Sequence, residues 1–418
     1  MTPVPLSRNR DFLLLQAGQV LSTIGSESTV IAYPLVVLAL THSPAKAGIV
    51  GFARIVPWAL FGLLAGLAVD RLPRKAMMIT SDIVRAFAVG SIAIAAAIGH
   101  LTFAHIAAVA FVEGSMYVFF NIAEVGALRS VVWTEQLPTA AAAEQARYST
   151  VTIVAPPLGG SLFGLGRALP FVAGALSPAF SLATLLSIRT PFEEERERDE
   201  SPLRTQLAEG FRFLWRHPFI RACALFATWT NLVFEGIVLA VIVVARRQGL
   251  SSGEIGALIA GLGVFSLLGS AAAPRLHRLM SMRAIVVAGF WAQLTVAAFL
   301  AYPSVYVLVG SIAPFAFFVP TLTAVVIGYR VAVTPDRLTG RVNAIARSIA
   351  LCGAPLGPLA AGLLLGSFSP RTAVAVFTAL LVVLAVAGSL SPSIRNAPSL
   401  SEIEPAVTER PVAPELAG

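Results

Sequence analysis

The chain has 418 residues, of which 56% are hydrophobic and only 12% are charged, and its mean hydropathy is +0.80. Soluble domains carry about 25% charged residues, so this composition excludes an ordinary soluble protein and indicates one that crosses a lipid bilayer several times. The net charge of +8 would suit a nucleic-acid binder, but the charges lie between apolar segments and leave no basic face, so we expect no nucleic-acid partner.

Apolar segments of about 20 residues, long enough to span a bilayer, follow one another along the chain. Short turns rich in Gly, Pro and Ser, such as "THSPAK" and "AYPS", join most of them. We therefore predict an all-α integral membrane protein with twelve transmembrane helices. The predicted spans are 12–40, 47–69, 76–98, 103–128, 140–166, 169–188, 219–244, 254–273, 284–301, 305–329, 343–366 and 371–391.

The chain divides into two similar parts. Residues 1–188 are predicted to form an N-terminal six-helix half, and residues 219–391 a C-terminal half. The fifth span of the first half contains "APPLGG" (155–160), and the fifth span of the second half contains the similar "GAPLGP" (353–358). Such duplication is typical of secondary transporters, which bind their substrate between the two repeats.

A charged connection at 189–218 separates the halves and is predicted to be a cytoplasmic linker that ends in an amphipathic helix on the membrane surface. The segment 392–418 contains prolines and scattered glutamates without periodicity, and is predicted to be a disordered cytoplasmic tail.

The positive charges predict the orientation. With the N-terminus inside, most of the 30 Lys and Arg fall on the cytoplasmic side, as the positive-inside rule requires. We expect a multi-pass protein of the bacterial inner (plasma) membrane with both termini in the cytoplasm and the bilayer as its surroundings. Within the first 391 residues, the exceptions are Arg54, inside a span, and the outer charges Lys46, Arg167, Arg246, Arg247 and Arg371.

The turn between the second and third spans carries a glycine, an aspartate four residues later and then several basic residues. This pattern resembles the signature loop of the major facilitator superfamily, although Pro73 stands where that family usually has glycine. The resemblance implies a gating role, in which Asp70 pairs with the start of span eleven or with Arg129. We also expect Gly62 and Gly66 to permit close helix packing. The predicted gating residues are Gly62, Gly66, Asp70, Arg71, Arg74, Lys75 and Arg129.

Other segments narrow the resemblance to an exporter branch of that superfamily, which holds enterobactin exporters and macrolide efflux proteins. They include "SDIVRA", "VFFNIAEVGALRSVV" and "VTPDRLTGRVNAIARSIALCGAPLG". The fifth span resembles the motif of proton-driven exporters, with Ala155 in place of the first glycine. Its predicted helix-bending and packing residues are Pro156, Pro157, Gly159 and Gly160.

Three glutamates lie near the centres of spans one, four and seven: Glu27, Glu113 and Glu235. Intramembrane carboxylates are costly and mark proton relays or substrate paths, and the resemblance implies that these spans line the central cavity. Each glutamate could instead cap a helix kink or pair with an arginine. Arg54, which we take as the only basic residue deep in a span, is predicted either to pair with Glu27 or to hold an anionic substrate.

Aromatic and amide side chains on spans four and seven would supply apolar area and a few polar contacts for a substrate. We expect Asp82 and Arg85 to form a local structural pair, and Glu124 to act at the cytoplasmic gate with Arg129. The predicted cavity residues besides the charged ones are Tyr117, Phe120, Asn121, Trp229 and Asn231.

We therefore predict a secondary active transporter, most simply a proton-coupled antiporter that exports amphiphilic drugs or secondary metabolites. The alternatives are a siderophore exporter and, less favoured, a proton-linked importer. The five histidines are scattered at membrane edges without a catalytic motif, which argues against an enzyme. We expect no cofactor and no metal site, small-molecule substrate and protons as partners, and a monomer.

Overall fold

The structure, a computed structural model, describes residues 5–192 and 203–396, and in these two ranges all regular structure is helical. Eleven helices in the described part are long and apolar enough to cross a membrane. The remaining predicted span, the fifth in chain order, corresponds to α5 (Leu137–Leu165). This helix has a comparable length but carries Glu144, Arg147 and other polar residues in its first half. The predicted all-α, twelve-helix architecture is confirmed.

The N-terminal bundle contains the first six spans, and each predicted span falls on one continuous helix. Prolines lie inside four of these helices, where they are tolerated because neighbouring helices take over the freed backbone groups. The helices are α1 (Arg10–Thr41), α2 (Pro44–Arg71), α3 (Arg74–Ala97), α4 (Phe103–Val131), α5 and α6 (Leu169–Ser187).

The C-terminal bundle contains the other six spans, two of which are interrupted. The ninth span changes to a 3-10 turn (η3, Leu294–Ala297) between α10 and α11, and the eleventh is broken between α13 and α14. The helices are α8 (Pro218–Arg247), α9 (Ser252–Leu279), α10 (Met282–Gln293), α11 (Ala298–Ala301), α12 (Val305–Val333), α13 (Asp336–Leu351), α14 (Leu356–Ser367), α15 (Pro370–Leu390) and α16 (Pro392–Arg395).

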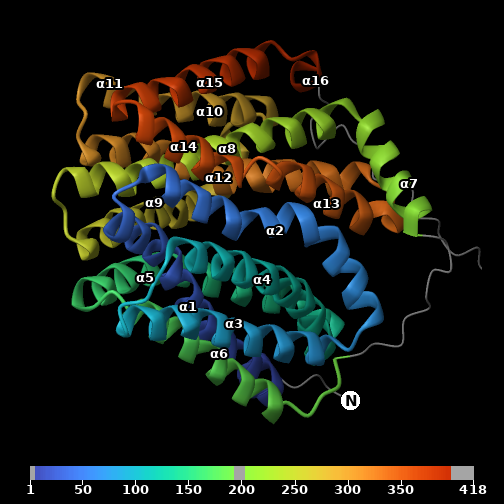
Figure 1. Ribbon diagram of the computed structural model, residues 1–418. Helices are drawn as coiled ribbons and strands as arrows, with labels where there is room; N and C mark the ends of the chain where they lie inside the picture. The colour runs from blue at the N-terminus through green and yellow to red at the C-terminus, as the bar shows by residue number, and fades with distance from the viewer. Residues whose placement is uncertain (1–4, 193–202, 397–418) are drawn as a thin grey trace, which may run out of the picture.

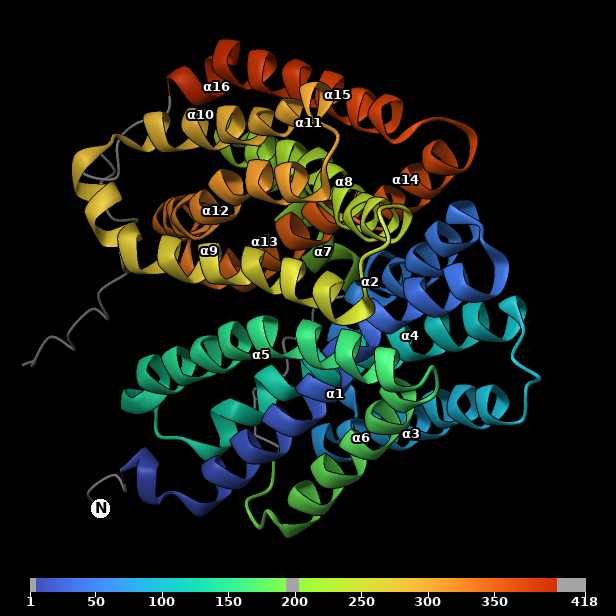
Figure 2. The ribbon, with the colours of Figure 1, turned by 90° about the vertical axis from the view of Figure 1, so that its left-hand side faces the viewer.

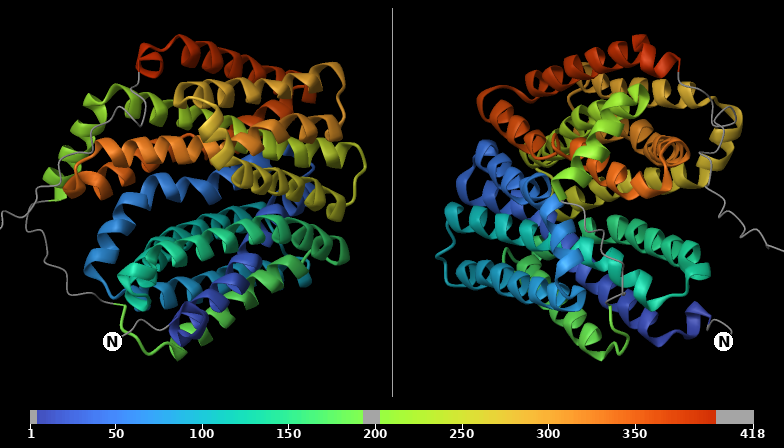
Figure 3. Two further views of the ribbon diagram at one scale, coloured as in Figure 1. Left: turned by 180° about the vertical axis from the view of Figure 1, so that it is seen from behind. Right: turned by 90° about the vertical axis from the view of Figure 1, so that its right-hand side faces the viewer.

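The two bundles lie one above the other in Figure 1, with the blue-to-green N-terminal bundle below. We call the end of the molecule that carries the start of α1 and α7 (Leu203–Arg216) the linker side, and the opposite end the far side. The bundles approach each other at the far side and separate at the linker side, where α2 bends away from the C-terminal bundle (Figures 1 and 3).

Glycines make the far-side contacts between the bundles possible. A Cβ atom on Gly160 of α5 would lie 2.1 Å from the carbonyl oxygen of Ser252 in α9, and one on Gly256 would lie 2.3 Å from that of Pro156. Both distances are too short for a side chain, so the backbones touch directly. Figure 2 shows α5 and α9 running next to each other.

The second far-side contact joins α2 to α14. A Cβ atom on Gly48 would lie 2.4 Å from the carbonyl oxygen of Pro358 and 2.9 Å from the Cα atom of Gly362. This contact is the counterpart of the first, because α2 and α9 are the second spans of their halves and α5 and α14 carry the two similar motifs. Both copies of the sequence motif therefore seal the same side of the molecule.

The linker helix α7 packs against α13. The Glu209 carboxylate lies 3.1 Å from Arg341 and 3.5 Å from Arg337, and Gly210 lets the two helices approach closely. A helix is present where the sequence predicts the amphipathic helix, and Leu214 on it is fully buried. Its location on the membrane surface stays a prediction. The predicted disordered tail, 392–418, is wrong for its first residues, because Pro392–Arg395 form α16 and Ile394 is fully buried. The rest of the tail beyond residue 396, like residues 193–202 of the linker, lies outside the described residues.

Candidate functional site

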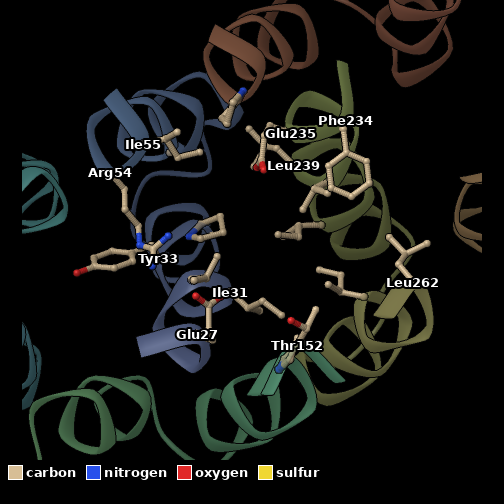
Figure 4. A pocket seen from close by; sticks show the side chains of 18 of the residues that line it. Glu27, Ile31, Tyr33, Arg54, Ile55, Thr152, Phe234, Glu235, Leu239 and Leu262 are labelled. Atoms are coloured by element: carbon tan, nitrogen blue, oxygen red, sulfur yellow. The ribbon is translucent and has the colours of Figure 1, made fainter. Parts of the chain in front are cut away.

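A central cavity of about 440 Å³ lies between the two bundles, within the 300–1,000 Å³ typical of small-molecule sites. Its wall is mostly apolar and is built from both halves, which contribute α1, α2 and α5 on one side and α8, α9, α12 and α14 on the other. Figure 4 shows the side chains that surround the opening. A site shared by both halves can change shape when the halves move relative to each other.

Glu27 of α1 and Glu235 of α8 bring acidic groups into this cavity from opposite bundles (Figure 4). Neither carboxylate forms an ion pair with another described residue, so both remain available to a proton or a cationic ligand. The structure thus brings together two of the three glutamates that the sequence singled out.

The third glutamate, Glu113, has a different environment. It is 2% exposed and lies behind Arg54, with its Oε2 atom 3.6 Å from the Arg54 Nε atom. Thr29 donates a hydrogen bond of 3.4 Å to its other carboxylate oxygen. The tight α2–α4 packing explains the pairing, since a Cβ atom on Gly114 would lie only 2.1 Å from the Arg54 carbonyl oxygen.

Arg54 therefore pairs with Glu113, and the predicted pairing with Glu27 is wrong in this conformation. The arginine still borders the central cavity, together with Tyr33 (Figure 4). Because its charge is already offset by Glu113, Glu27 and Glu235 determine the net sign of the cavity, which is negative when both are ionised.

A second cavity of about 720 Å³ extends from the centre toward the linker side, and we call it the linker-side cavity. It shares Glu27, Arg54 and Glu235 with the central cavity, and adds polar groups from α3, α4 and α5. Three predicted substrate contacts on α4 line it, as expected: Tyr117, Phe120 and Asn121.

Arg85 also lines the linker-side cavity. Its guanidinium lies 3.3 Å from Asp82, donates a hydrogen bond to Ser26 and lies 5.4 Å from the ring centroid of Tyr117. The predicted local pair with Asp82 is present, but the arginine also serves as part of the cavity wall. Its many partners hold it in a fixed position.

Glu124 pairs with Arg147 of α5 at 2.7 Å, whereas Arg129 is exposed. The predicted Glu124–Arg129 gate is therefore wrong in this conformation. Two nitrogen atoms of Arg147, Nε and Nη1, are buried without a hydrogen-bond partner in the described part of the structure. Arg54 is thus not the only basic residue deep in a span, because Arg85 and Arg147 line the cavity as well.

Asn231 and Trp229 do not line the central cavity. The Asn231 amide donates hydrogen bonds to the carbonyl oxygens of Ala227, at 2.9 Å, and Ala350, at 3.0 Å. The Ala350 carbonyl lies next to the break in span eleven, so Asn231 stabilises this break. Trp229 is 47% exposed and lies outside the lining of the cavities described here, because it projects from another side of α8.

The predicted gating turn is anchored within the N-terminal bundle. Arg74 donates to the carbonyl oxygens of Gly126, at 3.1 Å, and Phe192, at 3.0 Å, while Lys75 donates to that of Ile188 at 2.8 Å. These bonds join the turn to α4 and to the chain after α6. Arg71 is exposed. The Asp70 side chain lies outside the described residues, so the pairing of Asp70 with the start of span eleven or with Arg129 stays a prediction.

The expected close packing of Gly62 and Gly66 is absent from this conformation, because a Cβ atom on either residue would meet nothing within 4 Å. Both glycines belong to the second half of α2 (Pro44–Arg71), and α2 bends away from the C-terminal bundle at the linker side (Figure 1). Close packing occurs instead in the span-five motif. Within α5, the prolines Pro156 and Pro157 precede the tightly packed Gly159 and Gly160.

Two further cavity residues escaped the sequence analysis. Arg347 lies on α13 with its guanidinium 5.0 Å from the ring centroid of Trp58 on α2, so this pair joins the two bundles. Arg347 falls inside the predicted eleventh span, and this position was the signal that could have revealed it.

Within the described residues, no group of three or more His, Cys, Asp or Glu is placed to hold a metal ion.

Comparisons with known proteins agree with this geometry. Residues 16–292 match the model of the Major Facilitator Superfamily. The chain is 28% identical over 375 residues to the multidrug efflux pump Tap of Mycolicibacterium fortuitum, covering 84% of this chain and 88% of that protein. It is 26% identical over 380 residues to the Tap pump of Mycobacterium tuberculosis strain H37Rv, covering 85% and 87%.

Solved structures share the fold at low sequence identity. A bacterial homologue of the human lysosomal transporter Spinster, in an inward-facing and unoccupied conformation, matches with a TM-score of 0.71 and 16% identity, covering 93% of this chain and 97% of that one. The nucleoside transporter NupG matches with a TM-score of 0.69 and 14% identity, covering 94% and 100%. The chain belongs to the Major Facilitator Superfamily and is a multi-pass membrane transporter.

Proposed function

We propose that this transporter exports amphiphilic, drug-like molecules in exchange for protons by alternating access. The observation that carries the proposal is the placement of Glu27 and Glu235 on opposite bundles, facing one cavity that is sealed at the far side. A proton or a cationic substrate can bind there, and each carboxylate is carried by a different half.

The coupling follows from competition for these carboxylates. A protonated Glu27 or Glu235 is neutral and binds a cation weakly, so proton and substrate exclude each other. A charge that crosses 100 mV gains about 2.3 kcal/mol, which supports a concentration ratio of about 50 per charge. The mainly apolar wall of the cavity suits the apolar part of an amphiphile.

The function of the relatives supports export of drugs, because two Tap proteins that match most of this chain are multidrug efflux pumps. The linker side is the cytoplasmic side in this proposal, since the positively charged turns gather there. The structure then corresponds to the state that accepts substrate from the cytoplasm. We further propose that the two bundles are the functional halves, that the transporter works as a monomer and that it resides in the bacterial inner membrane.

The experiment uses the full chain in liposomes, with an imposed pH gradient and ethidium as the transported dye. The wild type is compared with Glu27→Gln and Glu235→Gln, and the exposed Glu135 provides the matched control Glu135→Gln. We expect dye accumulation that requires the gradient, a loss of most gradient-driven accumulation in both cavity variants and normal accumulation in the control.

If the rate of ethidium transport is the same with and without the pH gradient, and the same in Glu27→Gln and Glu235→Gln as in the wild type, proton coupling is excluded. If metal-chelating anions move and ethidium does not, the siderophore exporter becomes the better assignment. The pairing of Arg54 with Glu113 argues against that outcome, since it removes the proposed contact for an anion. Movement in the direction of the proton flux would indicate an importer.

A further inference from the structure

A third cavity lies entirely within the C-terminal bundle, and the proposed function does not use it. It measures about 670 Å³ and is lined by α8, α10, α12 and α13. Most of its wall is apolar or aromatic. The largest of these side chains are Phe226, Phe234, Phe290, Phe315 and Leu322. We call it the C-terminal cavity.

The polar part of the described lining contains arginine, asparagine, threonine and cysteine side chains but no carboxylate. Arg330, in the last turn of α12, has a buried Nε atom without a hydrogen-bond partner in the described part of the chain, and the Oδ1 atom of Asn343 on α13 is in the same situation. Unsatisfied buried polar atoms are rare in native structures and call for a partner. Both residues line the same space, but only the Arg330 nitrogen is a donor that an anion can satisfy; the Asn343 oxygen is an acceptor and needs a separate donor.

A second arginine borders the cavity. Arg347 lies one helical turn beyond Asn343 on α13, and its guanidinium is held by the Trp58 ring without an ion pair to any described residue. The described lining contains two arginines and neither Asp nor Glu. Its sign is therefore opposite to that of the central cavity, which contains Glu27 and Glu235.

We propose that the C-terminal cavity binds an amphiphilic anion, with a carboxylate or phosphate head group on Arg330 and Arg347 and an apolar chain along the aromatic wall. The guanidinium fork matches such head groups, and charge-assisted hydrogen bonds to it are about twice as strong as neutral ones. From Arg330 to Phe315 the cavity follows α12 for about 20 Å, a length that suits a single acyl chain. The ligand comes either from the bilayer, as a lipid, or from the solutes that the protein exports.

The test measures binding of the fluorescent fatty acid dansyl-undecanoate to the full chain in a neutral detergent, with the methyl ester of the same probe as the uncharged comparison. We expect the acid to bind the wild type and the ester to bind at least about tenfold more weakly, a factor that corresponds to about 1.4 kcal/mol. Arg330→Gln and Arg347→Gln should each weaken binding of the acid by a similar factor and leave the ester unchanged.

The exposed Arg278 on α9 provides the matched control Arg278→Gln, which should bind the acid like the wild type. Size-exclusion profiles and thermal unfolding midpoints show whether each variant is folded. If Arg330→Gln does not fold, Arg347→Gln decides the question. Equal affinity of the wild type for acid and ester, or wild-type affinity for the acid in a folded arginine variant, would overturn the proposal.

Two arms distinguish the sources of the ligand, and either positive result supports the site. A bilayer lipid predicts that native mass spectrometry detects an anionic lipid on the purified wild type and not on Arg330→Gln. An exported solute predicts that proteoliposomes accumulate dansyl-undecanoate, and that Arg330→Gln abolishes this accumulation. Both arms remain meaningful if proton coupling through Glu27 and Glu235 proves wrong, because the variants and the probe are different.

Discussion

The far-side contact between α5 and α9 gives the sharpest prediction about how the transporter changes state. Gly160→Ala adds one methyl group at a position where a Cβ atom would lie 2.1 Å from the Ser252 carbonyl oxygen. Non-bonded contacts of a Cβ atom with backbone oxygen need about 3.0 to 3.4 Å, so α5 and α9 must separate by about 1 Å. The obstacle is backbone, which cannot rotate away as a flexible side chain could.

The magnitude follows from the cost of overpacking, which is about 1–3 kcal/mol for an added methyl or methylene group in a well-packed contact. This cost falls on the state in which the far side is closed, and the state with an open far side avoids it. The equilibrium between the two states should therefore shift by about 5-fold to 150-fold toward an open far side.

The assay measures distances between spin labels in lipid nanodiscs, on a background in which Cys223 and Cys352 are replaced by serine. One pair, at His100 and Tyr302, reports on the far side, and another, at Glu135 and Leu279, reports on the linker side. We expect Gly160→Ala to lengthen the far-side distance and to shorten the linker-side distance.

The matched control is Gly164→Ala, one turn further along α5, where a Cβ atom would meet nothing within 4 Å. This variant should reproduce the wild-type distances at both pairs. If Gly160→Ala and Gly164→Ala give the same distance distributions, the direct backbone contact does not control closure of the far side and the reasoning fails.

Three further predictions concern the ion pair, the break in span eleven and the gating turn. Glu113→Gln leaves the Arg54 cation without its partner, a change that costs about 3–5 kcal/mol for a buried pair. The thermal unfolding midpoint of this variant should therefore fall well below that of Glu27→Gln. Equal midpoints of the two variants would contradict the pairing. Asn231→Leu removes the donor to the Ala350 carbonyl oxygen, at a cost of about 1–3 kcal/mol, and the unfolding midpoint should fall while the exposed-site control Trp229→Leu changes it less. Asp70→Asn should insert into the membrane normally and reduce dye transport, and full transport by this variant would make the turn a marker of topology without a gating role.

Much of the fold could be predicted from the sequence because hydropathy is a local property. Each of the twelve predicted spans falls on the helices of the structure, including the polar α5. The breaks in the ninth and eleventh spans were not predicted. The second of them depends on a distant partner, since Asn231 of α8 donates to the Ala350 carbonyl oxygen that the break leaves free.

The site was predictable in kind but not in detail. Glu27, Glu113 and Glu235 are equivalent from the sequence, yet the rotation of α4 turns Glu113 toward Arg54 and away from the cavity. The glycines show the same limit: the spacing of Gly62 and Gly66 predicts close packing, but which glycines touch depends on the conformational state. The positive-inside rule likewise predicts Arg347 on the cytoplasmic side, whereas the structure places it in the wall of the linker-side cavity.

The distribution of charge connects the two proposed sites. The central cavity is acidic, the C-terminal cavity is basic, and Arg347 borders both the C-terminal and the linker-side cavities. An anion bound to Arg347 would offset a positive charge on the path between the linker side and Glu235, and would therefore favour a cation on that path. Because the coupling of two binding free energies is reciprocal, a bound cation would favour the anion by the same factor. On these two proposals, the Arg347 guanidinium, which the C-terminal and linker-side cavities share, is the group that links the bound anion to the proposed export of a cationic drug.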